Sequence, residues 1–118
     1  MRTILVIDDE PAILELFVSY LENDDTRVLT ASNGRVAEEM LEKFPPDVII
    51  TDLLMPDKEG LETIREVKAQ YPDIKIITMS GMGNEVYLKT SKMLGADIAI
   101  TKPVDFTRLR SQLETMLS

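Results

Sequence analysis

The sequence of 118 residues contains no cysteine and no histidine. The absence of cysteine excludes disulfides, thiolate nucleophiles and cysteine-ligated zinc. The absence of histidine excludes a Ser-His-Asp triad, imidazole metal ligands and a phospho-histidine on this chain. Any metal site would therefore be built from oxygen ligands.

Basic residues are also few, because 13 lysines and arginines stand against 21 aspartates and glutamates, for a net charge of -8. Such a surface repels phosphate backbones and anionic lipids, so we expect no direct nucleic-acid binding and no membrane binding. The first apolar run covers only residues 4–7, which is far too short for a signal peptide or a membrane span. We therefore expect a cytoplasmic protein.

The remaining composition is that of one globular domain. Hydrophobic residues make up 44% of the chain and charged residues 29%, and the chain is too short for two separate cores. No long linker and no low-complexity stretch interrupts it. We expect one domain over residues 1–118.

Short β-branched runs alternate with segments of helical periodicity, which predicts an α/β fold of five βα units. The predicted strands are residues 3–7, 27–31, 48–51, 74–79 and 98–101. Four helices are indicated by apolar stripes with helical spacing, which are Leu14, Phe17, Val18 and Leu21; Ala37, Met40, Leu41 and Phe44; Leu61, Ile64, Val67 and Tyr71; and Phe106, Leu109, Leu113 and Met116.

The helix predicted for residues 84–94 is the weakest of the five. Its apolar stripe is thin and consists of Val86, Thr90, Met93 and Leu94. Gly81 and Gly83 loosen the chain just before it. A weak element is a candidate for motion, so we expect this helix to move.

Polar residues follow four of the predicted strands at the point where each strand ends. Asp8 and Asp9 follow the first strand, Asp52 the third, Ser80 the fourth and Lys102 the fifth. Each alone is typical of a turn, a helix cap or a solvated surface. In a parallel sheet, however, the carboxyl ends of the strands meet at one edge, where ligands bind.

Brought together, these side chains have the composition of a phosphoryl-transfer site. Carboxylates that lie so close repel one another unless a cation lies between them, and a set of oxygen ligands suits Mg²⁺. A phosphorylated carboxylate also needs a hydroxyl donor and a compact positive charge. Ser80 and Lys102 supply these two groups.

The whole chain resembles the receiver domain of response regulators from two-component systems. The matching elements are Asp8-Asp9, residues 52–56 with Gly60, Ser80-Gly81, Gly95-Ala96-Asp97 and Lys102-Pro103. The resemblance implies a flavodoxin-like (βα)5 fold with a doubly wound, parallel five-stranded sheet in the order 2-1-3-4-5. It also implies a single receiver domain over residues 1–118, with no output domain in this chain.

The resemblance implies a role for each matching residue. Asp52 would accept a phosphoryl group from a sensor histidine kinase or a histidine phosphotransfer protein. Lys102 would pair first with the carboxylate and then with the phosphoryl oxygens, and Ser80 would sense the phosphoryl group. The Mg²⁺ ligands would be Asp8, Asp9, Asp52 and the backbone carbonyl of Leu54. The chain would catalyse only its own phosphorylation and dephosphorylation.

The resemblance also implies how the signal leaves the site. The Ser80 loop and the fourth helix would shift and change the affinity for an unknown downstream protein or output domain. Residues of this output region are Gly81, Tyr87, Ala99 and Pro103. The fourth helix, fifth strand and fifth helix would form the docking surface or the interface of a homodimer.

Two departures from the family pattern bear on the switch. Ala99 stands where receivers usually carry a tyrosine or phenylalanine, so we hypothesise that Tyr87 or Met93 repacks instead. Leu54 and Met82 flank the expected acyl phosphate, and neither can orient a water molecule. We therefore expect slow autodephosphorylation.

Three other functions fit parts of the pattern. A flavodoxin-type flavin protein is disfavoured because residues 8–11 are acidic and end in proline, which suits no phosphate. An aspartyl-nucleophile phosphatase is disfavoured because Asp8 and Asp9 are adjacent instead of being spaced by one residue. The remaining alternative is a phosphorylation-independent interaction module on the receiver fold, which Ala99 leaves open.

Overall fold

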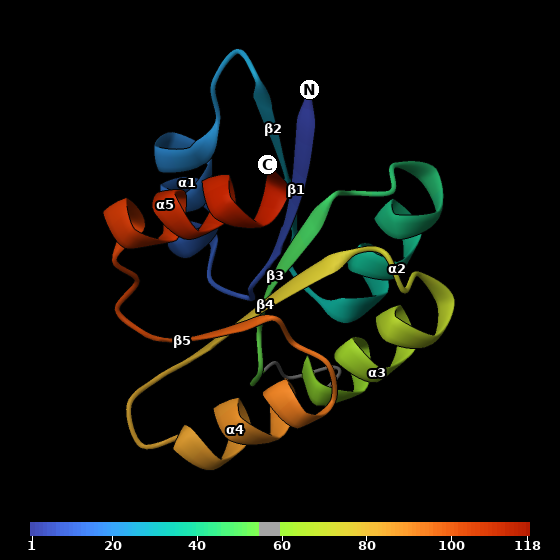
Figure 1. Ribbon diagram of the computed structural model, residues 1–118, viewed down its shortest axis with the longest axis vertical. Helices are drawn as coiled ribbons and strands as arrows, with labels where there is room; N and C mark the ends of the chain where they lie inside the picture. The colour runs from blue at the N-terminus through green and yellow to red at the C-terminus, as the bar shows by residue number, and fades with distance from the viewer. Residues whose placement is uncertain (55–59) are drawn as a thin grey trace.

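The apolar runs of the sequence form the strands of one parallel sheet in a computed structural model that describes residues 1–54 and 60–118. Strands and helices alternate along the chain (Figure 1). The strands are β1 (Arg2–Ile7), β2 (Thr26–Ala31), β3 (Val48–Asp52), β4 (Lys75–Ser80) and β5 (Ile98–Thr101). The helices are α1 (Pro11–Leu21), α2 (Gly34–Lys43), α3 (Gly60–Gln70), α4 (Glu85–Met93) and α5 (Phe106–Leu117).

The sheet has the order β2-β1-β3-β4-β5, and every neighbouring pair of strands is parallel. The predicted flavodoxin-like fold and its strand order are therefore confirmed. From β1 the chain moves outward to β2, and then it crosses to β3 on the other side of β1 and continues to β4 and β5. The strand order therefore reverses between β1 and β3. This is the point at which doubly wound sheets bind ligands.

Helices cover both faces of the sheet, and the side chains of each strand alternate between two cores. On one face, α1 and α5 bury Phe17, Leu21, Leu109 and Leu113 against β1, β3 and β4. On the other face, α2, α3 and α4 bury Ala37, Leu41, Ile64 and Leu88. Figure 1 shows the first helix pair on one side of the sheet and α2 and α3 on the other.

One apolar residue of the predicted second helix lies outside its core. Helix α2 ends at Lys43, and Phe44 follows it with a φ of -138° that is not helical. The Phe44 side chain is 45% exposed, and the Arg27 guanidinium lies 5.5 Å from its ring centroid. The prediction that Phe44 belongs to the buried stripe was wrong, because the helix ends before the residue reaches the sheet.

The buried face of the fourth helix also differs from the prediction. Val86 is 76% exposed and Met93 is 81% exposed, whereas Leu88 and Ser91 are buried. Two of the four residues predicted for the buried stripe, Val86 and Met93, therefore face solvent, whereas Leu94 is partly buried against the core. The reason is that the Ser91 hydroxyl is bonded to a buried threonine of β4, so a polar residue occupies the inner face.

Replacement of the core residue Phe17 is expected to test the packing of α1 on the sheet. Phe17 is fully buried, whereas its neighbour Leu16 is 43% exposed. Phe17→Ala should lower the free energy of unfolding by about 3–5 kcal/mol because it leaves a cavity. The matched Leu16→Ala change should alter it by less than about 0.5 kcal/mol. Urea unfolding measures both, and equal effects would contradict the assigned orientation of α1.

Candidate functional site at the carboxyl edge

The register of the sheet brings the predicted site residues to one edge. Ile7 pairs with Thr51, so the next residues, Asp8 and Asp52, lie side by side beyond β1 and at the end of β3. On the other side of β3, Asp52 pairs with Met79 of β4, so Ser80 lies one residue beyond the level of Asp52. Four strands therefore end at the same place, as the sequence predicted.

Lys102 joins the two carboxylates at this edge. Its Nζ donates to Oδ2 of Asp8 at 2.9 Å and to Oδ2 of Asp52 at 3.0 Å. The Asp8 side chain is fully buried, the Asp52 side chain is 9% exposed and the Lys102 side chain is 19% exposed. The backbone N–H of Lys102 also donates to the Ser80 carbonyl at 2.7 Å, which ties the loop after β5 to β4.

The environment of Lys102 keeps its side chain charged. Burial alone lowers the pKa of Lys102, but the hydrogen bonds to Asp8 and Asp52 and the negative charge of both carboxylates outweigh it. The net effect raises the pKa of Lys102 above its ordinary value of 10.5. At neutral pH Lys102 is therefore an ammonium group that is hydrogen-bonded to both Asp8 and Asp52.

Three carboxylates converge beside this ion pair. Ligand oxygens of Asp8, Asp9 and Glu10 lie within 4.8 Å of one another. Asp8 is also held in place, because its Oδ1 accepts the Glu10 backbone N–H at 2.9 Å. A cluster of oxygen donors with no nitrogen or sulfur ligand fits the chemistry of Mg²⁺. Glu10 was not among the predicted ligands, although its place directly after the acidic pair was the available signal.

The backbone around Asp52 is packed tightly. Oδ1 of Asp52 accepts the Leu54 N–H at 3.2 Å, and the Leu53 N–H donates to the Met79 carbonyl at 3.0 Å. A Cβ added at Gly60 would lie 2.6 Å from the Asp52 carbonyl oxygen and 2.6 Å from the Leu53 Cα. A glycine is thus needed at position 60, where α3 begins in close contact with the backbone of Asp52 and Leu53. This explains why Gly60 belongs to the matching motif. Residues 55 and 56 of the family motif lie outside the described residues.

Ser80 has an unsatisfied hydroxyl group. The residue is 1% exposed, and its Oγ has no hydrogen-bond partner within the described parts of the chain. A buried hydroxyl without a partner costs free energy unless another group is to bind it. This hydroxyl therefore has free capacity for an acceptor that reaches the edge.

None of the predicted output residues takes part in the ion pair, although Gly81 and Pro103 directly follow Ser80 and Lys102 in the chain. Ala99 is partly buried against the core below α4, and Pro103, which follows a cis peptide bond, is exposed. Tyr87 is 41% exposed, and Met93 projects into solvent, so neither is buried in place of the missing ring. Gly81 accepts the Asn84 N–H at 3.3 Å in the turn before α4.

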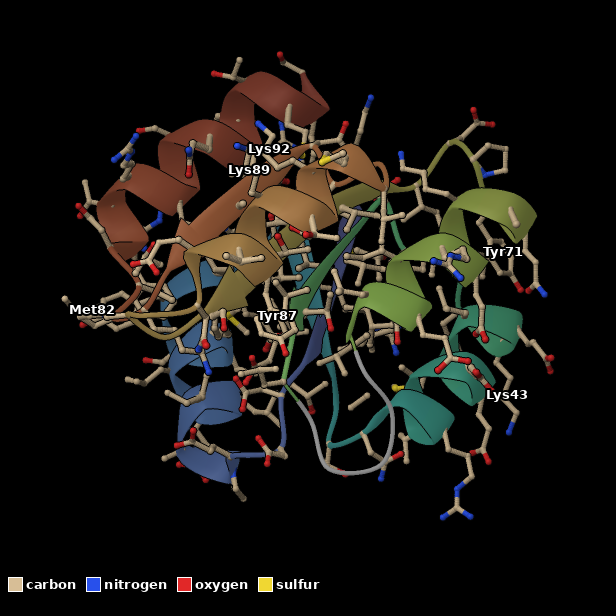
Figure 2. All side chains as sticks on the ribbon, turned by 90° about the horizontal axis from the view of Figure 1, so that it is seen from below. Lys43, Tyr71, Met82, Tyr87, Lys89 and Lys92 are labelled. Carbon is tan, nitrogen blue, oxygen red and sulfur yellow. The ribbon has the colours of Figure 1, made fainter. Side chains whose placement is uncertain are left out.

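The surface around α4 is partly apolar. Met82, in the loop before the helix, is 81% exposed and projects from the edge of the molecule (Figure 2). Leu54, the second residue expected beside the acyl phosphate, is 44% exposed. Lys89 and Lys92 lie on α4 itself (Figure 2).

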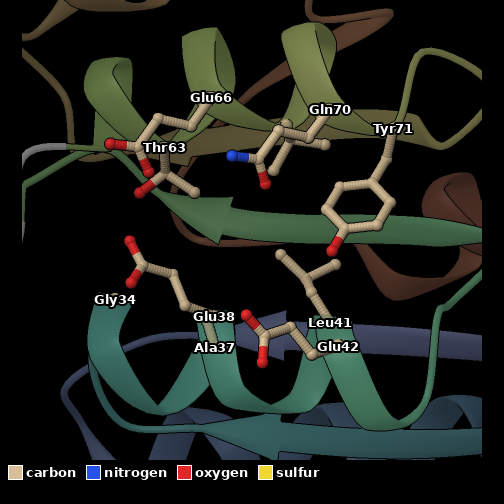
Figure 3. A pocket seen from close by; sticks show the side chains of 10 residues that line it. Gly34, Ala37, Glu38, Leu41, Glu42, Thr63, Glu66, Gln70 and Tyr71 are labelled. Atoms are coloured by element: carbon tan, nitrogen blue, oxygen red, sulfur yellow. The ribbon is translucent and has the colours of Figure 1, made fainter.

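A cavity of about 270 Å³ lies between α2 and α3, away from the ion pair. Glu38 and Glu42 of α2 face Glu66 and Gln70 of α3 across it (Figure 3). An acidic lining of this kind repels phosphate groups. The positive charge of Lys102 lies at the carboxyl edge of the sheet instead.

The fold and this edge define a doubly wound α/β protein with an acidic cluster and a partly buried lysine at the carboxyl edge of its sheet. The family model described as the response regulator receiver domain matches residues 4–114. The chain belongs to this family, whose members are signalling modules of two-component systems. The predicted family is therefore confirmed.

One curated relative is the Bacillus subtilis (strain 168) protein YesN, described as an uncharacterized transcriptional regulatory protein. It is 32% identical over 121 residues, which cover all of this chain and 33% of YesN. The chain thus spans about a third of the length of this relative.

Among the described residues, no helix is long and apolar enough to cross a membrane.

Solved structures show the same fold. A response regulator receiver domain protein from Clostridium thermocellum is 32% identical with a TM-score of 0.92, and the match covers 99% of this chain and 94% of that one. The receiver domain of a DNA-binding response regulator from Colwellia psychrerythraea 34H is 26% identical with a TM-score of 0.92, covering 99% and 98%. NtrX from Brucella abortus, in complex with ADP, is 28% identical with a TM-score of 0.92, covering 99% and 27%.

Removal of the Lys102 charge is expected to destabilise the protein in a pH-dependent manner. Because the pKa of Lys102 is raised on folding, its ion pairs stabilise the protein fully below pH 10.5 and lose this effect as pH rises through the higher folded value. Lys102→Met should therefore cost about 3–5 kcal/mol at pH 7 in metal-free buffer, because it leaves buried carboxylates unpaired. The cost should shrink at pH values above 10.5.

Denaturant unfolding of both proteins between neutral and strongly alkaline pH measures this difference. The comparison isolates the contribution of Lys102, because the two proteins differ at this residue alone. The double variant Asp8→Asn, Lys102→Met should be less destabilised than Lys102→Met alone. If the difference in the free energy of unfolding between wild type and Lys102→Met does not change with pH, the ion-pair assignment is contradicted.

Proposed function

We propose that this chain is a phosphoryl-accepting switch in which Asp52 receives a phosphoryl group from a sensor histidine kinase or a histidine phosphotransfer protein. The observation that carries the proposal is the Lys102 ammonium, hydrogen-bonded to both Asp8 and Asp52 at the edge where the buried Ser80 hydroxyl has no partner among the described residues. A carboxylate, a positive charge and a hydroxyl donor at one edge are the groups that a phosphoryl acceptor would need.

The transfer is a displacement at phosphorus. A carboxylate oxygen of Asp52 would form a bond to phosphorus while the bond from phosphorus to the donor imidazole nitrogen breaks. The donor ring would carry a proton from solvent on its other nitrogen, so that it leaves as neutral imidazole. Lys102 counters the charge on the reacting oxygens, because it is already held at the carboxylate before the donor arrives. Positioning and charge thus account for the chemistry.

The acidic cluster supports binding of Mg²⁺ by Asp8 and Asp9. By resemblance to the family, Asp52 and the Leu54 carbonyl would complete the ligand set. When bound, the ion would neutralise charge on the phosphoryl oxygens. Glu10 also lies in the cluster and is a further candidate ligand, directly or through water.

The phosphorylated state would differ from this structure at two side chains. A phosphoryl group brings about -1.5 to -2 charges and three strong acceptors. Lys102 would exchange a carboxylate partner for phosphoryl oxygens, and the Ser80 hydroxyl would gain its first acceptor. Both changes pull the ends of β4 and β5 toward Asp52, which would move the loop before α4.

The readers of this movement are also proposals. The exposed side chains of Val86 and Met93 make α4 part of a surface for a downstream partner or output domain, or for a second copy of the chain through α4, β5 and α5. We expect the switch to act in the cytoplasm. The alternative, an interaction module that does not need phosphate, is supported by the small side chain of Ala99.

Intact-mass measurement after incubation with Mg²⁺ and acetyl phosphate tests the acceptor. The wild type should gain the mass of one phosphoryl group, and Asp52→Asn should gain none, because an amide oxygen is a poor nucleophile. Omission of Mg²⁺ or addition of a chelator should also prevent the gain. An equal adduct on Asp52→Asn would remove Asp52 from its role, and no adduct on either protein would favour the alternative module.

The lifetime of the phosphorylated protein tests the two apolar residues beside the site. Leu54 and Met82 are both exposed, so substitution should not disturb the core. Because neither orients a water molecule, the phosphorylated wild type should outlast the Leu54→Asn, Met82→Glu variant by roughly tenfold or more. The decay of the mass adduct after removal of acetyl phosphate measures this, and a wild-type lifetime no longer than that of the variant refutes the expectation.

A further inference from the structure

A buried pair of hydroxyl groups links α4 to the strand that carries Ser80. Oγ1 of Thr78 on β4 lies 2.8 Å from Oγ of Ser91 on α4. Both residues are fully buried. Thr78 and Ser80 are two residues apart on the same strand, so their side chains point to the same face of the sheet. The contact therefore lies on the same strand and face as the unsatisfied Ser80 hydroxyl.

The donors and acceptors around this pair can be assigned. Ser91 Oγ donates to the Leu88 carbonyl at 2.6 Å, and a hydroxyl group has only one proton. Thr78 must then be the donor in its contact with Ser91. The Ile98 carbonyl of β5 lies 3.5 Å from Thr78 Oγ1 and is a second, longer acceptor for the same proton.

This arrangement lets the contact open at little cost. If α4 moves away from β4, the Thr78 proton can turn to the Ile98 carbonyl while Ser91 keeps its bond to Leu88. Both hydroxyl protons then keep an acceptor. The usual penalty for breaking a buried hydrogen bond, which is a buried donor left without an acceptor, is therefore avoided. Thr78 is also opposite Ala99 in the register, where no large side chain crowds it.

We propose that Thr78 and Ser91 form a latch that holds α4 against β4 in the unmodified protein and releases it when Ser80 is drawn toward phosphorylated Asp52. This inference rests on the proposed function. Thr78 and Ser91 are positioning residues, because neither reaches the reacting atoms. The latch supplies the link between Ser80 and α4 in a chain that has Ala99 in place of an aromatic reporter.

Amide hydrogen exchange of the α4 segment, followed by mass spectrometry, tests the latch. The wild type should exchange slowly in this segment with Mg²⁺ alone and faster with Mg²⁺ and beryllofluoride, a stable mimic of the phosphoryl group. Ser91→Ala and Thr78→Val should raise the rate with Mg²⁺ alone by roughly three- to tenfold. In these two variants, adding beryllofluoride should cause little further increase in the exchange rate of the α4 segment.

Two variants serve as matched controls. Thr90→Ala removes the neighbouring hydroxyl, which donates to the Val86 carbonyl of its own helix, and should leave the exchange difference intact. Thr78→Ser keeps a hydroxyl at position 78 and should restore wild-type behaviour. Thr78→Val and Ser91→Ala test the same bond from its two ends, so one of them suffices if the other does not fold.

The phosphoryl adduct from acetyl phosphate is measured on the same samples. If Ser91→Ala and Thr78→Val form the adduct in normal yield and still show the same change in α4 exchange on adding beryllofluoride as the wild type, the latch alone is overturned. This holds even if both variants unfold at lower temperature. No adduct on the wild type overturns the proposed function and the latch with it. A normal adduct with the exchange difference lost in these two variants, but kept in Thr90→Ala and Thr78→Ser, supports the latch.

Discussion

The Lys102 ammonium between Asp8 and Asp52 is the interaction on which the rest of the site depends. Asp8 is completely buried, and a buried carboxylate is tolerated only with a compensating charge and hydrogen bonds. Lys102 provides the charge, and the Glu10 N–H provides a further bond. The same ammonium also contacts Asp52. The group that stabilises the folded edge would therefore also prepare it for the proposed phosphoryl transfer.

The sheet makes this interaction possible because its strands are parallel and end together. The residues in contact are as far apart in the chain as Asp8 and Lys102, yet each is adjacent to a strand end. Helix α4 is held differently from the helices on the opposite face of the sheet. Helices α1 and α5 pack through large apolar side chains such as Phe17 and Leu109, whereas α4 buries only Leu88 and Ser91.

This difference has a consequence for switching. Apolar packing is lost gradually and at high cost when a helix moves, because every displaced methyl group leaves a gap. A hydrogen bond between Thr78 and Ser91, by contrast, has two arrangements in which both protons keep an acceptor. A helix held in this way suits a two-state change, and it lies directly behind the strand that carries Ser80.

The sequence by itself determined the five βα units and the polar residues at the strand ends, because apolar periodicity and strand-end position are local properties. Thus Asp8, Asp52, Ser80 and Lys102 could be found without coordinates. Only the tertiary structure decided that Lys102 contacts both carboxylates, that Glu10 joins the acidic cluster, and which face of α4 is buried. Val86 and Met93 suggested the wrong face, because a thin apolar stripe does not set the rotation of a helix. That rotation depends on a partner hydroxyl on Thr78, a residue 13 positions away in the chain.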